Sequence, residues 1–376
     1  MKTESKTILV NYLGRNGAGP IFAYEMTKGL LEHGCRVYAI LSDAISNLKD
    51  WECLPLENLV TVHTYSNKFN FITATVRFHI VDLKRLKKIF QNVKFNACYM
   101  PMGHFWDKPI NKIFKQTKTI YTLHDPLPHS GSSKLLYHLS RKKISSYDEI
   151  VILSGCFKET VSKYFNHSPE HIHVIPHGIF DYYDRFSFKP TERTGEYNFL
   201  FLGRIEKYKG LHLLSQAYHR LFSERKDISL YIVGKGDFTE YQAEFLTGTP
   251  DCGGENVTVV NRFIDDNEVA SYFEGKNIIT VLPYIDATQS GVVPIAMQHE
   301  SLLIVTNTGG LAEQTGYGKY AVVAQTNADS LYECMKLAVE QYASFKPKIK
   351  EAKKYIESLS WNHLSELLLD LSLIQI

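Results

Sequence analysis

The chain has few of the features that classify a protein quickly. Its six cysteines are spread over 376 residues, and none forms a CxxC or another metal-ligand spacing, so we expect reduced thiols and neither zinc nor disulfides. There is no run of roughly 18 or more apolar residues, which excludes a membrane-spanning helix. The opening segment MKTESKTILVNYLG lacks the apolar region and cleavage site of a signal peptide, which predicts a cytoplasmic protein.

Net charge is also nearly absent, since 42 Lys and Arg face 40 Asp and Glu, a formal +2. This balance excludes a nucleic-acid binder held by gross charge. It hides an asymmetry: residues 1–190 carry 25 basic and 16 acidic residues, a net +9, whereas residues 191–376 carry 17 and 24, a net −7. Solvated helix faces would explain the basic excess, and so would a surface that rests on anionic lipid headgroups. The basic residues cluster at Lys84-Arg85-Leu86-Lys87-Lys88, at Lys108, Lys112, Lys115 and Lys118, and at Arg141-Lys142-Lys143.

Apolar residues make up 44% of the chain, enough for two hydrophobic cores. Each half opens with an apolar strand, a glycine turn and an amphipathic helix, at 7–32 and again at 197–224. Apolar runs that alternate with helix-length segments are typical of parallel strands covered on both faces. We therefore predict an α/β protein of two doubly wound domains with a polar linker at 184–196. The further predicted strands are 35–41, 97–101, 119–123, 149–154, 171–176, 229–234, 257–261, 277–283 and 302–306.

Two motifs of the first half follow predicted strands, where ligands of open parallel sheets bind. In GRNGAGP (14–20), Gly17 and Gly19 would let main-chain N–H groups approach an anion or a sugar, although a tight structural turn explains them nearly as well. His124 lies just past the strand that ends at Leu123. A lone histidine is more often structural than functional.

Two motifs of the second half carry a stronger signal. GRIEKYKGL (203–211) places Arg204 at a strand end and Lys209 at the start of a helix, and such cations neutralise a departing diphosphate, unless they are merely solvated. In PYIDATQSGVVPIAM (283–297), the N–H groups near Gly291 and Val292 open a helix and could bind a phosphate. An ordinary Ser/Thr-capped helix is the alternative interpretation.

At these residues the chain resembles the retaining GT-B glycosyltransferases of family GT4, the glycosyl transferases group 1. The resemblance implies the GT-B fold: two doubly wound Rossmann-like domains with a cleft between them. It implies an acceptor-side domain at 1–186, a domain at 187–355 that binds the nucleotide-sugar donor, and a helix at 356–376 that crosses back to the first domain. The resembling segments, in order, are VIPHGIF (174–180), FLGRIEKYKGLHLL (201–214), LYIVGKGD (230–237), RFIDDNEVASYF (262–273), ATQSGVVPIAM (287–297), TNTGGLAE (306–313) and SWNHLSELLLD (360–370).

The resemblance also implies roles for individual residues. The donor diphosphate would be held by Arg204 and Lys209, and His124 would bond the donor sugar near the developing oxocarbenium charge. The remaining donor-binding positions that it implies are Gly17, Gly19, Gly203, Arg262, Phe263, Ile264, Thr288, Gln289, Ser290, Gly291 and Val292.

One departure from the family concerns two glutamates around the QSG-like loop. Thr288 stands at the first position and Ile295 or Ala296 at the second, as in a sub-branch with an ATQSG-type loop. We expect Gln289, Ser290 and the main chain of the loop to replace the missing carboxylates.

The resemblance implies a metal-independent hexosyltransferase that needs no cofactor and uses a UDP- or GDP-sugar. Its acceptor would be a saccharide, lipid-linked in view of the basic first half, in cell-surface polysaccharide biosynthesis. The enzyme would be cytoplasmic or peripheral at the inner face of the membrane. Two alternatives stay open: a catalytically inactive subunit that binds a nucleotide or a partner, and a nucleotide-sugar 2-epimerase.

Overall fold

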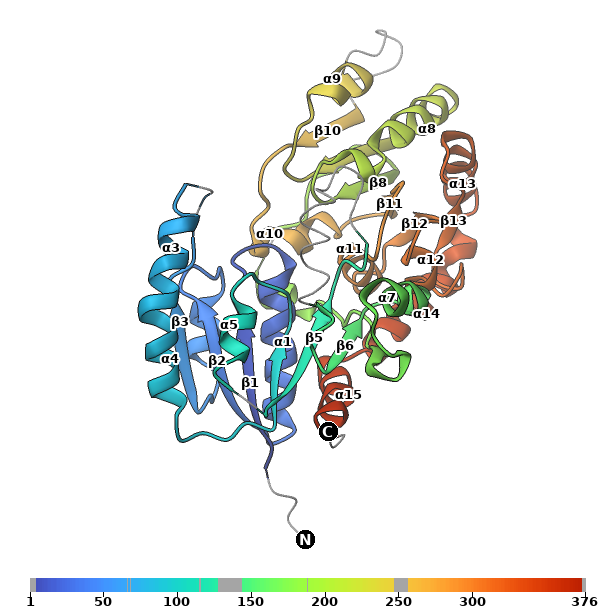
Figure 1. Cartoon of the computed structure of the whole chain (residues 1–376). Coiled ribbons are helices and arrows are strands. Elements are labelled where there is room, and N and C mark those ends of the chain that lie inside the picture. The colour runs from blue at the N-terminus through green and yellow to red at the C-terminus, as the bar shows by residue number, and fades with distance from the viewer. Residues whose placement is uncertain are drawn as a thin grey trace. The chain divides into compact units, whose positions relative to one another are not determined.

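The computed structural model of the chain (Figure 1) describes residues 5–65, 67, 69–114, 116–127, 144–187, 189–246 and 256–373. Lys115 and the basic cluster 141–143 lie outside these ranges. The described residues form two compact units: unit 1 holds 5–126, 144–176 and 360–373, and unit 2 holds Leu127 and 177–359.

The boundary between the units therefore falls after Pro176, earlier than the expected boundary at 186, and the return to unit 1 comes at Ser360. The segment that we expected as a linker packs on unit 2. The Arg193 guanidinium donates a hydrogen bond to the Tyr272 carbonyl and lies 4.4 Å from the Tyr231 ring. Burial lowers the pKa of Arg193 to about 10. A polar composition predicted a linker here, but the aromatic rings of unit 2 bury this arginine.

Unit 1 is built on a sheet of seven parallel strands in the order β3-β2-β1-β4-β5-β6-β7. Helices cover both faces, so the strand residues are almost continuously buried and apolar. The strands are β1 (Thr7–Tyr12), β2 (Arg36–Ser42), β3 (Asn58–Val62), β4 (Ala97–Met100), β5 (Lys118–Leu123), β6 (Glu149–Ile152) and β7 (Ile172–Val174).

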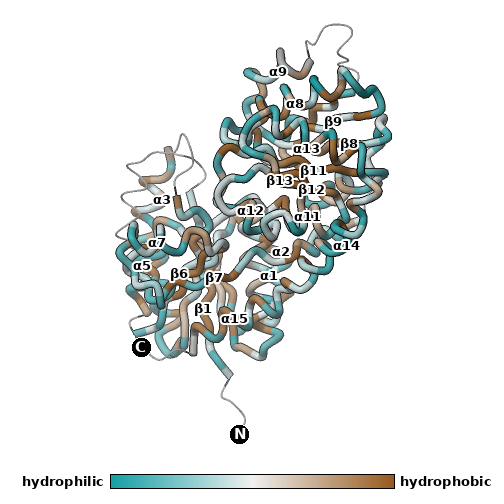
Figure 2. The backbone as a smooth tube through the Cα atoms, turned by 90° about the vertical axis from the view of Figure 1, so that its right-hand side faces the viewer, coloured by the Kyte–Doolittle hydropathy of each residue, from teal (hydrophilic) through white to brown (hydrophobic). Residues whose placement is uncertain are grey.

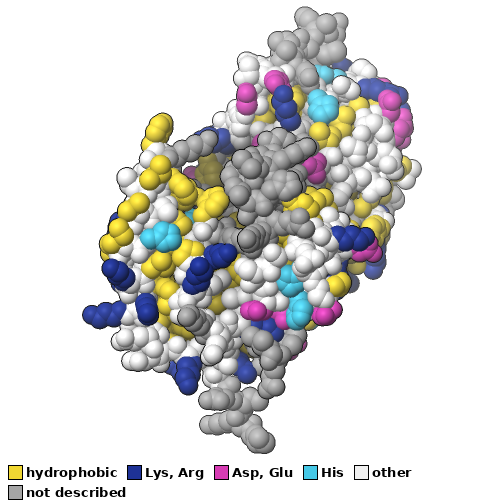
Figure 3. All heavy atoms as spheres, viewed as in Figure 1, with side chains coloured by type: hydrophobic (Ala, Val, Ile, Leu, Met, Phe, Trp, Pro, Cys, Tyr) yellow, Lys and Arg dark blue, Asp and Glu magenta, His cyan; other side chains and the backbone are white. Residues whose placement is uncertain are grey.

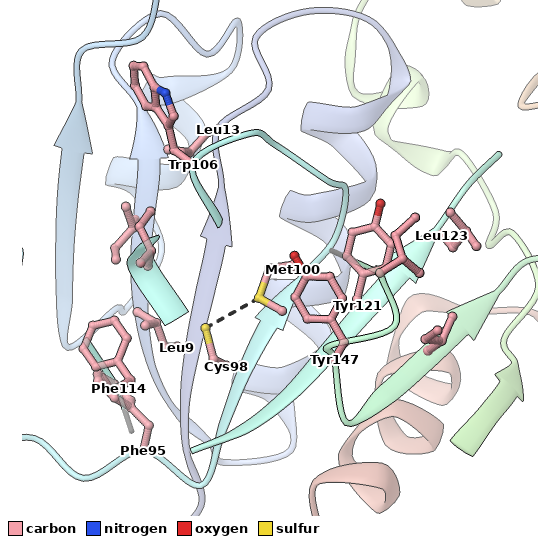
Figure 4. Packing of buried hydrophobic residues seen from close by; sticks show 14 of the residues in the cluster. Leu9, Leu13, Phe95, Cys98, Met100, Trp106, Phe114, Tyr121, Leu123 and Tyr147 are labelled. Carbon is pink, nitrogen blue, oxygen red and sulfur yellow. Dashed lines mark hydrogen bonds between the residues drawn. The ribbon is translucent and has the colours of Figure 1, made fainter. Parts of the chain in front are cut away.

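The core of unit 1 is rich in aromatic side chains. Phe78 and Trp106 stack with ring centroids 4.3 Å apart, and Tyr121 stacks on Tyr147 at 4.6 Å, next to the buried Cys98 (Figure 4). The helices of the unit are α1 (Ala18–Glu32), α2 (Leu48–Glu52), α3 (Phe71–Arg77), the π-helical turn η1 (Phe78–Asp82), α4 (Leu83–Phe90), α5 (Asp107–Asn111), η2 (Gly155–Phe157), α7 (Lys158–Phe165), η3 (Pro169–His171) and α15 (Trp361–Leu373).

The helix α15 packs against α1 within unit 1. The two backbones approach closely at Gly29, where a Cβ atom would lie 2.7 Å from the Trp361 carbonyl oxygen. Trp361 packs edge-on against Phe22 with ring centroids 5.4 Å apart. The segment at the end of the sequence therefore completes the core of the unit that the first residues begin.

Unit 2 repeats the design with six parallel strands in the order β10-β9-β8-β11-β12-β13. Figure 2 shows apolar strands such as β11 and β12 inside this unit. Its strands are β8 (Tyr197–Leu202), β9 (Ile228–Val233), β10 (Val257–Val260), β11 (Ile278–Leu282), β12 (Leu302–Thr306) and β13 (Val322–Ala324). Its helices are η4 (Asp181–Arg185), η5 (Lys207–Lys209), α8 (Leu211–Glu224), α9 (Thr239–Leu246), α10 (Asp266–Val269), η8 (Ala270–Tyr272), α11 (Val292–Gln298), α12 (Leu311–Gln314), α13 (Ala328–Glu340) and α14 (Tyr342–Ser358).

In each sheet the strand order reverses beside the unit's first strand, which is the arrangement of a doubly wound fold. This confirms the predicted α/β class with two doubly wound sheets. Among the described residues, none of the helices combines the length and the apolarity that a membrane crossing needs.

Candidate active site

The two motifs predicted to hold a donor lie side by side in unit 2, because β8 and β11 are neighbours at the point where the strand order reverses. Residues 203–210 follow β8 and residues 283–292 follow β11. The Ile285 N–H donates to the Tyr208 carbonyl at 2.8 Å. A Cβ atom at Gly210, whose φ is +69°, would lie 1.9 Å from the Pro283 carbonyl oxygen. Only glycine lets the two loops meet here.

Arg204 and Lys209 are presented from the first of these loops. The exposed Arg204 guanidinium lies 2.8 Å from a Glu206 carboxylate oxygen, and exposed ion pairs of this kind are weak. Arg204 could therefore exchange Glu206 for an anionic ligand at little cost. The Lys209 ammonium lies 3.6 Å from the centroid of the Tyr284 ring, a cation–π contact that holds the ammonium at the end of β11.

The loop after β11 is clamped by Gln314 of α12. Its amide donates to the Ser290 carbonyl at 2.9 Å and accepts from the Ser290 N–H at 3.0 Å. The Ser290 hydroxyl lies 3.2 Å from the Tyr284 hydroxyl and accepts from the Val292 N–H at 3.3 Å. Ser290 and the Val292 N–H thus already have partners inside the loop, so binding a ligand would require them to exchange these bonds.

Gln289 differs from its neighbours. Within the described part of the chain, its amide oxygen is buried and has no hydrogen-bond partner. Thr288 is buried. At the second position of the missing glutamates, Ile295 and Ala296 are buried in α11. Among the buried side-chain atoms that the structure describes in this loop, the Gln289 oxygen is the acceptor without a partner.

The donor-binding segment implied by the resemblance, Arg262-Phe263-Ile264, follows β10, two strands away from β8. The Arg262 guanidinium donates to both carboxylate oxygens of Glu268, and this interaction raises its pKa. Phe263 is exposed beside it. Because the guanidinium is bound to Glu268, this segment would contact a ligand through its main chain and the Phe263 ring.

The remaining predicted residues lie in unit 1. Gly17 has a φ of +84° and precedes α1, and a Cβ atom at Gly19 would lie 2.4 Å from the Tyr12 hydroxyl. His124 follows β5, with its ring 4.8 Å from that of Phe22.

The protonation of His124 follows from its surroundings. Its Nε2 lies 2.8 Å from the Pro101 carbonyl oxygen and must donate the hydrogen bond, because a carbonyl only accepts. Burial lowers the pKa of His124. The ring is therefore neutral at pH 7, with Nδ1 as an acceptor suited to a sugar hydroxyl.

The structure thus brings Gly203, Arg204 and Lys209 together with loop 288–292, whereas Gly17, Gly19 and His124 belong to the other unit. Their roles in binding stay predictions. Sequence reasoning missed Tyr284 and Gln314. An aromatic residue directly after a strand end was the available signal for Tyr284. Within the described ranges, no group of three or more His, Cys, Asp or Glu side chains is placed to hold a metal ion.

Comparison with known proteins agrees with this arrangement. The family model "Glycosyltransferase Family 4" matches residues 19–180 and the model "Glycosyl transferases group 1" matches residues 196–341. The chain belongs to the glycosyltransferases of the group 1 and family 4 type, and its fold is GT-B.

Individual relatives are distant. The O-antigen chain mannosyltransferase C of Escherichia coli is 27% identical over 253 residues, which cover 63% of this chain and 62% of that protein. The match thus spans less than two thirds of that relative's own length. Two solved structures share the fold: sucrose-phosphate synthase from Thermosynechococcus elongatus (TM-score 0.72, 15% identity, 97% and 98% of the two chains) and an Anabaena protein in complex with UDP and glucose (TM-score 0.71, 13% identity, 97% and 98%).

Proposed function

We propose that the protein is a retaining glycosyltransferase that moves a hexose from a nucleotide-diphosphate sugar to a hydroxyl group of a saccharide. The observation that carries this proposal is the pair of cations, Arg204 and Lys209, presented from one loop where the strand order of unit 2 reverses. The mannosyltransferase relative acts on the O-antigen chain, which supports an acceptor in cell-surface polysaccharide biosynthesis.

In the proposed reaction, the bond between the anomeric carbon and the donor phosphate oxygen breaks as the acceptor oxygen bonds to the same face of the sugar. The departing phosphate oxygen takes the proton of the acceptor hydroxyl. Arg204 and Lys209 stabilise the negative charge that grows on the diphosphate. The two cations would do here what a divalent metal does in other transferases. Neutral His124 would accept a hydrogen bond from a hydroxyl of the sugar.

The test replaces each cation singly. Arg204→Ala and Lys209→Ala should each lower kcat by about 10²- to 10³-fold, the cost of removing one group that stabilises transition-state charge. Lys207→Ala is the matched control, because Lys207 lies in the same turn but pairs with Glu240 at 3.0 Å. The assay measures release of the nucleoside diphosphate. Near-normal rates in both cation variants would refute the assignment.

The donor is proposed to be a UDP- or GDP-sugar. A screen of nucleotide sugars for thermal stabilisation identifies it, because a ligand that binds the folded state raises the melting temperature in proportion to its affinity and concentration. Thr288 and Ile295 or Ala296 stand where the family has glutamates. This lack of carboxylates favours a second candidate, a subunit that binds a nucleotide without turnover. Stabilisation by a donor with no release of the nucleoside diphosphate, even by slow hydrolysis, would support that candidate.

We further propose that the acceptor is lipid-linked and that the enzyme works at the inner face of the cell membrane. The net +9 of residues 1–190 supports this location, because each basic residue near an anionic surface adds about 1 kcal/mol of attraction. Protein that stays wholly soluble in the presence of anionic vesicles at low salt would contradict it.

A further inference from the structure

The outer face of α3 and η1 exposes apolar side chains that the core of unit 1 does not use. Ile72, Val76 and Ile80 follow one another at helical spacing and are 71%, 53% and 58% exposed. Phe69 precedes them at 96% exposure, and Val81 is exposed beside Ile80. Scattered apolar side chains on a surface are ordinary, but a stripe along one element marks a contact surface.

The inner face of the same segment packs in the core of unit 1. Ala74 and Phe78 belong to the buried cluster of unit 1, and Leu86 continues that face into α4. A helix that is apolar on both faces is expected where something covers each face. The π-helical turn η1 inserts an extra residue, which allows both Ile80 and Val81 to face outward.

The exposed charges of Asp, Glu, Lys and Arg on this segment have one sign. Among residues 69–94 the one carboxylate is that of Asp82, which is buried and lies 3.4 Å from Arg85. Figure 3 shows hydrophobic side chains along α3 and basic ones over α4. The basic side continues into a groove of about 870 Å³ lined in part by Lys87, Lys94 and Lys112. The basic residues of 69–94 are Arg77, Lys84, Arg85, Lys87, Lys88 and Lys94.

We propose that the face formed by 69–88 docks on an anionic lipid bilayer. Phe69, Ile72, Val76 and Ile80 enter the boundary between headgroups and acyl chains, and the lysines of α4 contact the headgroups. An apolar stripe with a basic flank is the pattern of a segment that lies in a membrane interface. A second copy of the chain is a poorer occupant, because a symmetric pairing over this face would bring the two basic clusters together.

This inference rests on the proposed membrane location and names the element responsible for it. It involves neither Arg204 nor Lys209, so transferase activity toward a water-soluble acceptor is expected to be independent of it. Loss of docking and loss of catalysis can therefore be measured separately.

The experiment is flotation of the full-length protein with vesicles of phosphatidylcholine containing phosphatidylglycerol, compared with phosphatidylcholine alone, at low and high salt. Wild-type protein should float with the anionic vesicles. The triple variant Ile72→Ser/Val76→Ser/Ile80→Ser should lose at least ten-fold in the bound-to-free ratio, with an unchanged melting temperature and an unchanged rate of donor hydrolysis.

A second test variant, Lys84→Glu/Lys88→Glu, should abolish binding at low salt. Two matched controls accompany the test variants. The variant Lys346→Glu/Lys350→Glu, an exposed pair at the same spacing on α14, should bind as wild type. Leu337→Ser, an exposed apolar residue of α13, should also bind normally.

Three outcomes would overturn the proposal. If the triple variant floats as wild type does, the apolar face is not the docking element, although the membrane location stands. If wild-type protein does not float, the docking face and the membrane location are both wrong. The transferase assay still tests the proposed activity separately. If light scattering shows a dimer that the triple variant loses, a second copy covers this face instead.

Discussion

At the scale of single residues, Gln289 is a side chain of the candidate site with a buried polar atom that has no hydrogen-bond partner within the described residues. Its buried amide oxygen has no partner in the described part of the chain, and such an atom costs free energy unless a ligand supplies a donor. A sugar hydroxyl could supply it where other family members use a carboxylate.

Gln289→Met should therefore leave the free energy of unfolding unchanged or slightly higher, and should reduce the thermal stabilisation caused by the donor. Gln314→Met is the matched control. It removes two hydrogen bonds to Ser290 and should cost about 1–3 kcal/mol of stability, because it leaves main-chain groups unpaired. Urea unfolding with and without donor measures both effects. Equal losses of stability in the two variants would contradict the assignment.

Some site residues could be predicted from the sequence and others could not. Arg204 and Lys209 were identifiable because both flank a glycine turn after an apolar strand. The contact of Lys209 with Tyr284 joins residues far apart in the sequence. It depends on β8 lying next to β11, and strand order is not a property of either segment alone. The same holds for Gln314 and Ser290.

At the scale of elements, the predicted strands were confirmed where burial is continuous, as in β1 and β8. The strands that we did not predict, β3 and β13, both lie at an edge of their sheets. β3 has exposed or half-buried residues at three of its five positions, and β13 has only three residues. Edge strands bury less apolar surface, which weakens the pattern that identifies a parallel strand, although the other two edge strands, β7 and β10, were predicted.

The amino ends of β5, β6 and β7 meet at a buried carboxylate, far along the strands from the candidate site residues of this unit. Burial alone would raise the pKa of Glu149. Hydrogen bonds donated by Lys118, His173 and His171 outweigh burial and hold that pKa below its usual value. Because the unfolded state binds this proton at higher pH, the stabilisation is complete at neutral pH and is lost as pH falls through the lowered pKa.

Glu149→Gln should cost about 3–5 kcal/mol at pH 7, since it removes the carboxylate that pairs with the buried Lys118 ammonium. The difference from wild type should shrink as the pH falls below about 4, near the pKa of an unfolded glutamate. Urea unfolding at several pH values measures it. Glu57→Gln, which removes an exposed partner of Arg36, is the control and should cost much less. A difference that does not change with pH would contradict the linkage.

At the scale of the whole molecule, composition predicted two domains but misplaced the boundary. Residues 184–196 are polar, yet Arg193 is buried against rings of unit 2. The division of charge into +9 and −7 was visible in the sequence. The family resemblance implied that α15 joins unit 1, whereas its close contact with α1 at Gly29 is a feature of the folded structure.

Trp361→Ala should destabilise unit 1 by about 3–5 kcal/mol, the usual cost of deleting a buried aromatic side chain. Trp361 is buried against Phe22, and no part of this contact belongs to unit 2. Calorimetry should show one of two unfolding transitions shifted. Leu331→Ala, a buried residue of α13 in unit 2, should shift the other. A common shift of a single transition in both variants would show that the units unfold together.

The position of α15 also bears on how the chain is synthesised. Unit 1 needs α15 to cover α1, but the residues 177–359 of unit 2 lie between them in the sequence. At about 5–20 residues per second, a ribosome needs on the order of 10 seconds or more for that stretch. Throughout this time the side of Phe22 that packs against Trp361 in the folded unit has no contact from α15. The first unit to leave the ribosome is therefore the last to finish folding.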